Sequence, residues 1–444
     1  IPKALMAMGI PTMLGMMVNA IYNLVDAYFV GSLGTSQMGA ISVVYPLGQV
    51  VVGLGLLFGN GSASYLSRLL GKGDKEKANQ VASTALYSSI TVGAIMIILS
   101  IIFLRPILKF LGATDSIMPY AITYASIYII SCIFNVFNVT MNNIVTSEGA
   151  AKTTMCALMT GAILNIGLDP VFIYILNMGV AGAAIATAIS QIVSTLVYLT
   201  FILRKKSTYH FRIRNFSFTK DIMSEIFKIG IPTLVFQILT SLSISFVNTK
   251  SMVYGDSVIA GMGAVTRIVS MGSLMVFGFI KGFQPIAGYS YGAKKFYRLQ
   301  EAIKTSILWS TIFCVIYGLI LAIFSKGIIS QFTKMDLDMI RVGTQSLRIN
   351  GFSFMLFGFY TVYSSLLLAL GKGLAGFFLG ACRQGICFIP VILILPVFWG
   401  INGIMYVQPI ADVLSAVITI FMAVHLHKEL ALSKQKFLSG QQNN

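Results

Sequence analysis

Long apolar runs alternate with short polar connectors along almost the whole chain. Because about 20 consecutive apolar residues span the hydrocarbon core of a bilayer as a helix, this pattern predicts about twelve transmembrane helices. The fold class is therefore an all-α membrane protein. The expected spans are residues 5–30, 38–66, 79–104, 118–146, 153–175, 181–203, 226–250, 258–288, 302–324, 340–369, 374–397 and 402–426.

The two halves of the chain repeat each other. The motif GIPT at residues 9–12 recurs at 230–233, and the same shift of 221 positions places Gly182 on Gly403. Six spans in each half predict two pseudo-symmetric six-helix bundles, an architecture typical of transporters. The expected organisation is an N-terminal bundle at 1–204, a cytoplasmic basic linker at 205–224, a C-terminal bundle at 225–428 and a cytoplasmic tail at 429–444.

Composition and charge agree with this architecture. Of 444 residues, 56% are hydrophobic and only 10% are charged, whereas soluble proteins have about 25% charged residues, so a soluble enzyme is excluded. The net charge of +17 comes from Lys and Arg in short connectors, which indicates topology rather than nucleic-acid binding. The basic connectors follow the even-numbered spans, so we expect both termini in the cytoplasm.

Motifs for catalysis or for a bound cofactor are absent from the sequence. There is no HExxH, GxSxG or P-loop motif, and the five cysteines do not have metal-ligand spacing. We therefore expect no enzyme activity, and no cofactor other than a coupling ion. The chain begins at Ile1 rather than at a methionine, and we expect a short stretch to precede it, without a cleavable signal peptide.

The first span carries an acid. Asp26 lies near its far end, and an acid inside a membrane costs a few kcal/mol on insertion scales, so it is a functional candidate. Spacing places a polar stripe on one face of this helix, and the proline near its start invites a bend. The stripe and the proline are Asn19, Tyr22, Asn23, Asp26 and Pro11.

The fifth span carries a second acid. Asn165 and Asp169 are four residues apart and so share a helical face, while spans four and six supply Asn142 and Thr187. Two buried acids with amide and hydroxyl neighbours suit exchange of H⁺, or of a Na⁺ ion held by Asp26, Asn165 and Asp169. The alternative is that each acid bonds a neighbouring helix without titrating.

The second half differs chemically from the first. Its apolar runs contain Arg267, Lys281, Arg383 and Asp412, and for these we favour structural pairing, with Asp412 offsetting one of the cations. Methionine and aromatic side chains suit a cavity that accepts varied cations. Candidate cavity residues are Met16, Met17, Gln237, Met262, Tyr360 and Tyr363.

Several short motifs resemble those of the multidrug and toxic compound extrusion (MATE) family, most closely its bacterial multidrug exporters. They are VDAYFVG at 25–31, GKGDKEKA at 71–78, SEGAAK at 147–152, the NxxxD face at 165–169 and YGAKK at 291–295. The resemblance implies two six-helix bundles around a V-shaped central cavity, and antiport of organic cations against H⁺ or Na⁺. It also implies a coupling network formed by Asp26, Asp169, Asn142, Asn165 and Thr187.

The leading hypothesis is therefore a secondary active multidrug antiporter that works by alternating access, confers antibiotic resistance and lies in the bacterial plasma membrane. We expect its partners to be small drugs or organic cations and the bilayer, with no nucleic acid, and we expect a monomer. The rival is a flippase for lipid-linked precursors, which would need Arg267, Lys281 and Arg383 in its cavity. A membrane-embedded enzyme is a weaker alternative, since only the two aspartates support it.

Overall fold

The computed structural model describes residues 1–444 except 34, 112, 114, 332–336 and 443–444, and omits some further side chains. Within the described residues every regular element is a helix, which confirms the predicted all-α fold. The chain divides into two compact units, Ala7–Leu234 and Ile1–Met6 with Val235–Asn444. Helices α1 and α8 contribute to both units.

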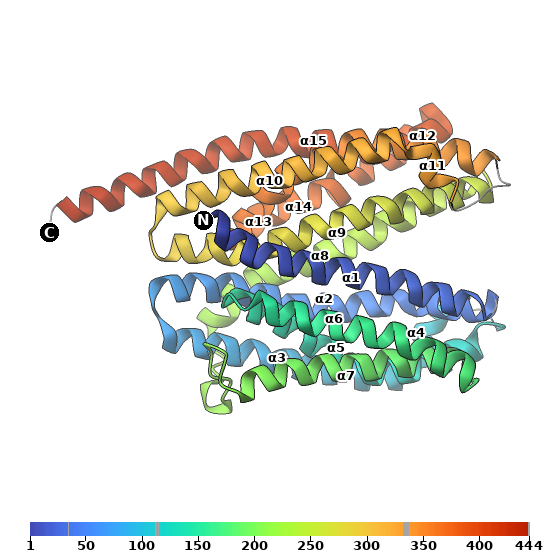
Figure 1. Ribbon diagram of the computed structural model, residues 1–444, viewed down its shortest axis with the longest axis horizontal. Coiled ribbons are helices and arrows are strands. Elements are labelled where there is room, and N and C mark those ends of the chain that lie inside the picture. Colours follow the sequence, from blue (N-terminus) through green and yellow to red (C-terminus); the bar gives the residue numbers. More distant parts are fainter. Residues whose placement is uncertain (34, 112, 114, 332–336, 443–444) are drawn as a thin grey trace. The chain divides into compact units, whose positions relative to one another are not determined.

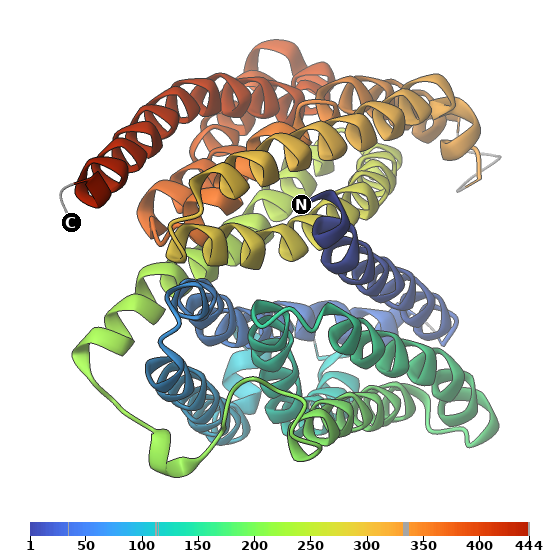
Figure 2. The same ribbon diagram turned by 60° about the vertical axis from the view of Figure 1, so that its left-hand side comes forward.

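The N-terminal unit contains the long helices that carry the two acids (Figure 1). Residues 204–219 connect α7 to α8 and pass along α3 (Figure 2). The elements are α1 (Pro2–Gly31), α2 (Thr35–Lys72), α3 (Lys75–Ile102), α4 (Leu104–Phe110), α5 (Met118–Ser147), α6 (Ala151–Pro170), the π-helix η1 (Val171–Ile175), α7 (Gly179–Leu203), the 3₁₀-helix η2 (Ile213–Asn215) and the start of α8 (Lys220–Met252).

The C-terminal unit contains the rest of α8 and two interrupted spans. Helices α12 and α13 meet at a bend of 52°, and α15 is broken at Gly400, whose φ of 57° is in the left-handed region that favours glycine. The elements are α9 (Asp256–Gly292), α10 (Phe296–Ile323), α11 (Ser325–Ile329), α12 (Leu337–Phe354), α13 (Phe357–Ala369), α14 (Gly373–Ala381), the π-helix η3 (Cys382–Ile386) and α15 (Phe388–Gln442).

The number of spans agrees with the predicted pattern. Ten helices in the described part of the chain are long and apolar enough to cross a membrane, or eleven if α12 and α13 form one span. One of the ten is the 63-residue stretch Gly373–Gln435. At about 1.5 Å per residue it is far longer than one bilayer, and the break at Gly400 divides it into two crossings. Helix α15 also continues to Gln442, through the part predicted as a tail.

The repeated GIPT motif has a packing role in its second copy. A Cβ on Gly230 would lie 2.1 Å from the carbonyl oxygen of Leu57 on α2. Only a residue without a side chain lets the backbones of α2 and α8 approach so closely. This contact fixes the first turns of α8 on the N-terminal unit.

Candidate functional site

The two acids of the N-terminal unit meet. The carboxyl groups of Asp26 on α1 and Asp169 at the end of α6 lie close enough to interact directly, and Asp169 is 0% exposed. An ionised carboxylate can only accept hydrogen bonds, so two carboxyl groups this close can bond to each other only when one of them carries a proton. The Oδ1 atoms of both acids are buried without a hydrogen-bond partner. The pair therefore has unused capacity for a proton or a small cation.

Three neighbours surround this pair. Asn165 lies one turn before Asp169, and the amide orientation that satisfies both of its groups has Nδ2 donating to Asp169 Oδ2 (3.1 Å). In this orientation Asn165 Oδ1 accepts from the backbone N–H of Thr187 (3.2 Å). The Thr187 hydroxyl is in turn hydrogen-bonded to Tyr22 of α1. The structure thus brings together Asp26, Asp169, Asn165, Thr187 and Tyr22.

The local backbone fixes the ends of the helices that carry the acids. Pro170 directly follows Asp169 and lacks a backbone N–H, and the chain then forms the π-helix η1. Such π-turns are rare and often occur at functional sites. The hydroxyl of Tyr174 on η1 donates to the carbonyl oxygen of Phe29 (2.9 Å), which lies close after Asp26 on α1. The end of α1 is therefore attached to the segment that follows Asp169.

One neighbour of the pair was missed by the sequence analysis. Tyr124 of α5 is buried and lies within electrostatic range of both Asp26 and Asp169. Its ring stacks on that of Tyr128, with centroids 5.7 Å apart. The sequence feature that could have indicated Tyr124 is its spacing from Tyr128, because residues four apart lie on one face of the helix in span four.

Other predicted residues of the first half lie elsewhere or are described only in part. Asn142 donates to the Tyr198 hydroxyl (3.2 Å), so its membership of the coupling network stays a prediction. Pro11 lies inside a helix, α1, that continues through it. Asn19, Met16 and Met17 are half-buried on α1, while the side chain of Asn23 lies outside the described residues.

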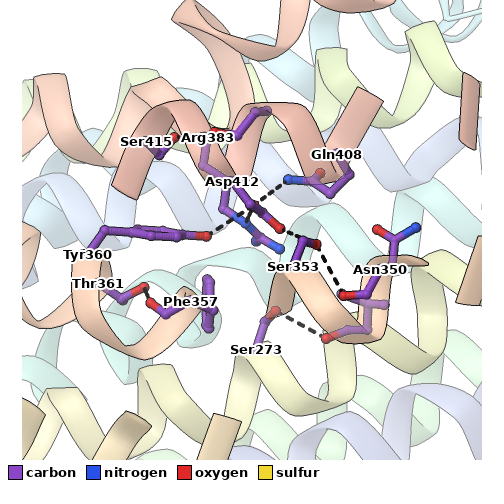
Figure 3. A network of polar contacts seen from close by, with 12 residues as sticks. Ser273, Asn350, Ser353, Phe357, Tyr360, Thr361, Arg383, Gln408, Asp412 and Ser415 are labelled. Atoms are coloured by element: carbon purple, nitrogen blue, oxygen red, sulfur yellow. Dashed lines mark hydrogen bonds and ion pairs between the residues drawn. The ribbon is translucent and has the colours of Figure 1, made fainter. Parts of the chain in front are cut away.

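The C-terminal unit has a buried acid of its own, Asp412, in a different environment from the pair of the N-terminal unit (Figure 3). Asp412 on α15 is 1% exposed and pairs with Arg383 of η3 (Nε to Oδ1, 2.9 Å), which confirms the expected offset of a cation. The Arg383 guanidinium also lies over the ring of Phe357, 4.5 Å from its centroid.

Three neutral side chains complete the shell of Asp412. Ser353 donates to Oδ2 (2.9 Å), while Tyr360 and Gln408 donate to Oδ1 at 3.2 and 3.0 Å. Ser353 is at the end of α12 and Tyr360 at the start of α13. Asp412 therefore joins the two sides of the 52° bend, and its charge is fully compensated.

The remaining candidates of the second half lie within the C-terminal unit. The Tyr363 hydroxyl is 2.9 Å from Nε2 of His427, and Met262 is 6% exposed in the apolar core. Gln237 and Lys281 are half-buried and Arg267 is exposed. A cavity role for Gln237, Met262, Tyr360 and Tyr363 stays a prediction.

Comparison with known proteins identifies the family. The MatE family model matches residues 11–171 and 232–394. The chain belongs to the MATE family. The two matched stretches begin 221 positions apart, which is the shift of the internal repeat.

Relatives of this MATE chain match it over almost its full length. It is 30% identical over 437 residues to the multidrug export protein MepA of Staphylococcus haemolyticus, covering 98% of this chain and 96% of that protein. MepA of Staphylococcus saprophyticus is 30% identical over 441 residues, at 99% and 97% coverage. A solved structure described as the outward-facing conformation of a multidrug resistance MATE family transporter superposes with a TM-score of 0.92, 26% identity and coverage of 97% and 96%.

MATE proteins are membrane transporters and not enzymes. This chain is therefore a multi-pass membrane transporter, and the predictions of a transporter fold and of no enzyme activity are confirmed.

Proposed function

We propose that this chain is a secondary active antiporter that exports lipophilic or cationic drugs in exchange for H⁺, with Na⁺ as the second candidate for the coupling ion. The proposal places it as a monomer in the bacterial plasma membrane, with both termini in the cytoplasm. Its drug specificity is inferred from the names of the MepA relatives.

The carboxyl pair Asp26–Asp169 carries the proposal. Asp169 is buried and Asp26 half-buried, their carboxyl groups interact, and the Oδ1 atom of each is buried without a partner. Two carboxylates in contact repel each other unless a proton neutralises one of them. Proton binding therefore favours the conformation with the acids in contact, and proton loss favours one with the acids apart.

Coupling follows if the drug prefers the other conformation. A ligand shifts a conformational equilibrium only through its difference in affinity between the states. A proton that binds the contacting pair and a drug that binds the separated pair would therefore exclude each other. Alternating access then exchanges one for the other across the membrane.

The hydrogen bonds around Asn165 favour H⁺ over Na⁺. A hard cation needs several oxygen ligands, but the amide oxygen of Asn165 already accepts from Thr187 N, and its nitrogen faces Asp169. Among the buried side-chain oxygens that the structure describes around the pair, the two Oδ1 atoms are the ones without a hydrogen-bond partner. A proton needs no more than one of them.

The buried acid of the C-terminal unit, Asp412, is a weaker candidate for this role. Asp412 accepts from four donors inside its own unit, so both of its carboxylate oxygens are already occupied. This also weakens the flippase alternative, because Arg383 is committed to Asp412 inside its own unit and is not free to bind a pyrophosphate.

Transport of ethidium into proteoliposomes tests the proposal. We would impose either a pH gradient or a Na⁺ gradient alone and compare wild type with Asp26→Asn, Asp169→Asn and the exposed control Asp338→Asn. The expected result is uptake driven by the pH gradient, lost in the first two variants and kept in the control. Normal uptake by Asp26→Asn and Asp169→Asn would refute the role of the pair, and uptake driven only by Na⁺ would replace H⁺ as the coupling ion.

A further inference from the structure

Residues 204–219 are here called the docked linker. The beginning of this linker is hydrogen-bonded to the N-terminal unit. Ser207 donates through its hydroxyl to both carboxylate oxygens of Glu148 (3.0 Å each), which lies between α5 and α6. The backbone N–H of Thr208 donates to the same carboxylate (2.5 Å). The Tyr209 hydroxyl is 3.1 Å from that of Ser147.

The following residues of the docked linker are fixed to α3 (Figure 2). These contacts use backbone groups of the linker and side chains of the helix, so they hold the linker in one place irrespective of its own side chains. They are His210 N to Asn79 Oδ1 (2.8 Å), Ser83 Oγ to His210 O (3.1 Å), Tyr87 OH to Phe211 O (3.2 Å), Ser217 N to Thr84 Oγ1 (3.0 Å) and Thr84 Oγ1 to Ser217 O (3.3 Å).

Between and beyond these contacts the docked linker presents apolar side chains outward. Ile213 is 77% exposed, Phe218 is 70% exposed and Phe216 is 42% exposed. The rings of Phe216 and Phe218 stack on each other, with centroids 6.4 Å apart.

Cations lie among the exposed apolar residues. Arg212 and Arg214 flank Ile213, and Lys220 follows Phe218, all three with exposed side chains. No ion pair of these three is found within the described residues. Basic residues that alternate with large apolar ones are typical of a segment that lies in the headgroup layer of a membrane.

The position of the docked linker along α3 places it at that layer. The linker contacts α3 from Asn79 to Tyr87, and the exposed large apolar residues of α3 begin at Ile95 and continue to Ile102. The linker therefore lies toward the polar end of α3, about 12 Å along the helix from the start of its exposed apolar surface. A segment there would lie near the layer where headgroups meet acyl chains.

We propose that the docked linker is an interfacial anchor that binds anionic phospholipid, with Ile213, Phe216 and Phe218 in the acyl boundary and Arg212, Arg214 and Lys220 on the headgroup phosphates. The anchor holds the segment between the two six-helix halves at a constant depth while the halves change conformation. This inference depends on the proposed membrane orientation only for which leaflet the anchor binds. It does not depend on which coupling ion the transporter uses.

Quenching by brominated lipids tests the anchor in the full chain. A single reporter is obtained by Phe218→Trp in a background of Trp309→Phe and Trp399→Phe, which removes both native tryptophans. The protein is reconstituted into vesicles of phosphatidylcholine mixed with phosphatidylglycerol, and the bromine is placed on one lipid or the other. Both leaflets have the same composition, so the result is independent of orientation.

We expect stronger quenching by brominated phosphatidylglycerol, with a preference of about fivefold for each arginine on a headgroup, since one cation near an anionic surface contributes about 1 kcal/mol. The preference should fall in Arg212→Gln/Arg214→Gln and at about 1 M salt, where the Debye length is about 3 Å. The matched control Lys294→Gln/Lys295→Gln loses the same charge in another connector. This control should keep the preference for brominated phosphatidylglycerol.

Two outcomes overturn the proposal. If the reporter emits as a water-exposed tryptophan and neither lipid quenches it, the outward side chains face the cytosol and a soluble partner instead. If both lipids quench equally in the parent and in Arg212→Gln/Arg214→Gln, the arginines do not select headgroups. Ethidium transport, measured in the same vesicles, reports separately on the proposed antiport.

Discussion

Removing the charge of Asp412 while leaving Arg383 in place should destabilise the C-terminal unit strongly. The side chains of Arg383 and Asp412 are only 9% and 1% exposed. Breaking a buried ion pair by removing one partner costs about 3–5 kcal/mol, because the other charge stays buried without compensation. Asp412→Asn preserves the shape of the side chain, so it isolates the loss of charge.

The expected change in melting temperature follows from this energy. For a unit of 150–250 residues, 1 kcal/mol corresponds to about 2–4 °C, so Asp412→Asn should lower the melting temperature by about 6–20 °C. The double variant Asp412→Asn/Arg383→Met removes both charges and should be more stable than Asp412→Asn alone, with a coupling energy of about 0.5–3 kcal/mol.

A thiol-reactive fluorogenic dye can report this unfolding. Cys132, Cys314, Cys382 and Cys387 are buried and free, so they react only when the structure opens, whereas the exposed Cys156 is replaced by serine in every variant to remove its reaction in the folded state. The control is Asp338→Asn, which breaks a pair with Arg341 that is 74% exposed on both sides. An exposed pair contributes about 0–1 kcal/mol.

A shift by Asp412→Asn no larger than that by Asp338→Asn would refute an uncompensated buried charge on Arg383. So would a double variant less stable than the sum of the two single variants predicts. In either case the Arg383 charge would be compensated by groups other than Asp412.

Two further predictions concern the N-terminal unit. Burial raises the pKa of Glu148 from 4.5 to about 7, although Ser207 and Thr208 donate hydrogen bonds to its carboxylate. The pKa is therefore higher in the folded than in the unfolded chain. The stabilising contribution of protonated Glu148 is complete below pH 4.5 and declines as the pH rises through about 7. Hydrogen exchange of residues 207–211 should therefore accelerate across this range in wild type and change less in Glu148→Gln, and equal pH dependence in both would contradict the assignment. Separately, Gly182→Ala places a Cβ 2.7 Å from the backbone of Phe172 and should cost about 1–3 kcal/mol by overpacking, whereas Gly167→Ala meets nothing within 4 Å and should leave the melting temperature of the dye assay unchanged or slightly higher.

The sequence pattern was sufficient for the spans, the repeat and the first contacts of the site. A helix crossing a bilayer must be apolar over its whole length, so each span is visible in the residues themselves. The four-residue spacing of Asn165 and Asp169 places them on one helical face, and the structure brings them into contact. The intramembrane position of Asp26 likewise identified the residue that meets Asp169.

Features that depend on the backbone were not visible. The π-turns of η1 and η3 and the break at Gly400 change the helical register over a few residues without altering the apolar pattern. The docked linker is held largely through backbone groups, which every residue type carries. The pairing of Arg383 with Asp412 joins different segments, and spacing along one helix cannot reveal it.

The Arg383–Asp412 pair also has a consequence for how the chain enters the membrane. The two residues lie on opposite sides of the Gly400 break, on consecutive crossings. On insertion scales an Arg or an Asp at the centre of a lone helix costs about 2.5–3.5 kcal/mol, and each of these crossings carries one. Entering lipid as a closed hairpin spares both segments most of that penalty, so during biosynthesis the last two crossings should leave the translocon together rather than one after the other.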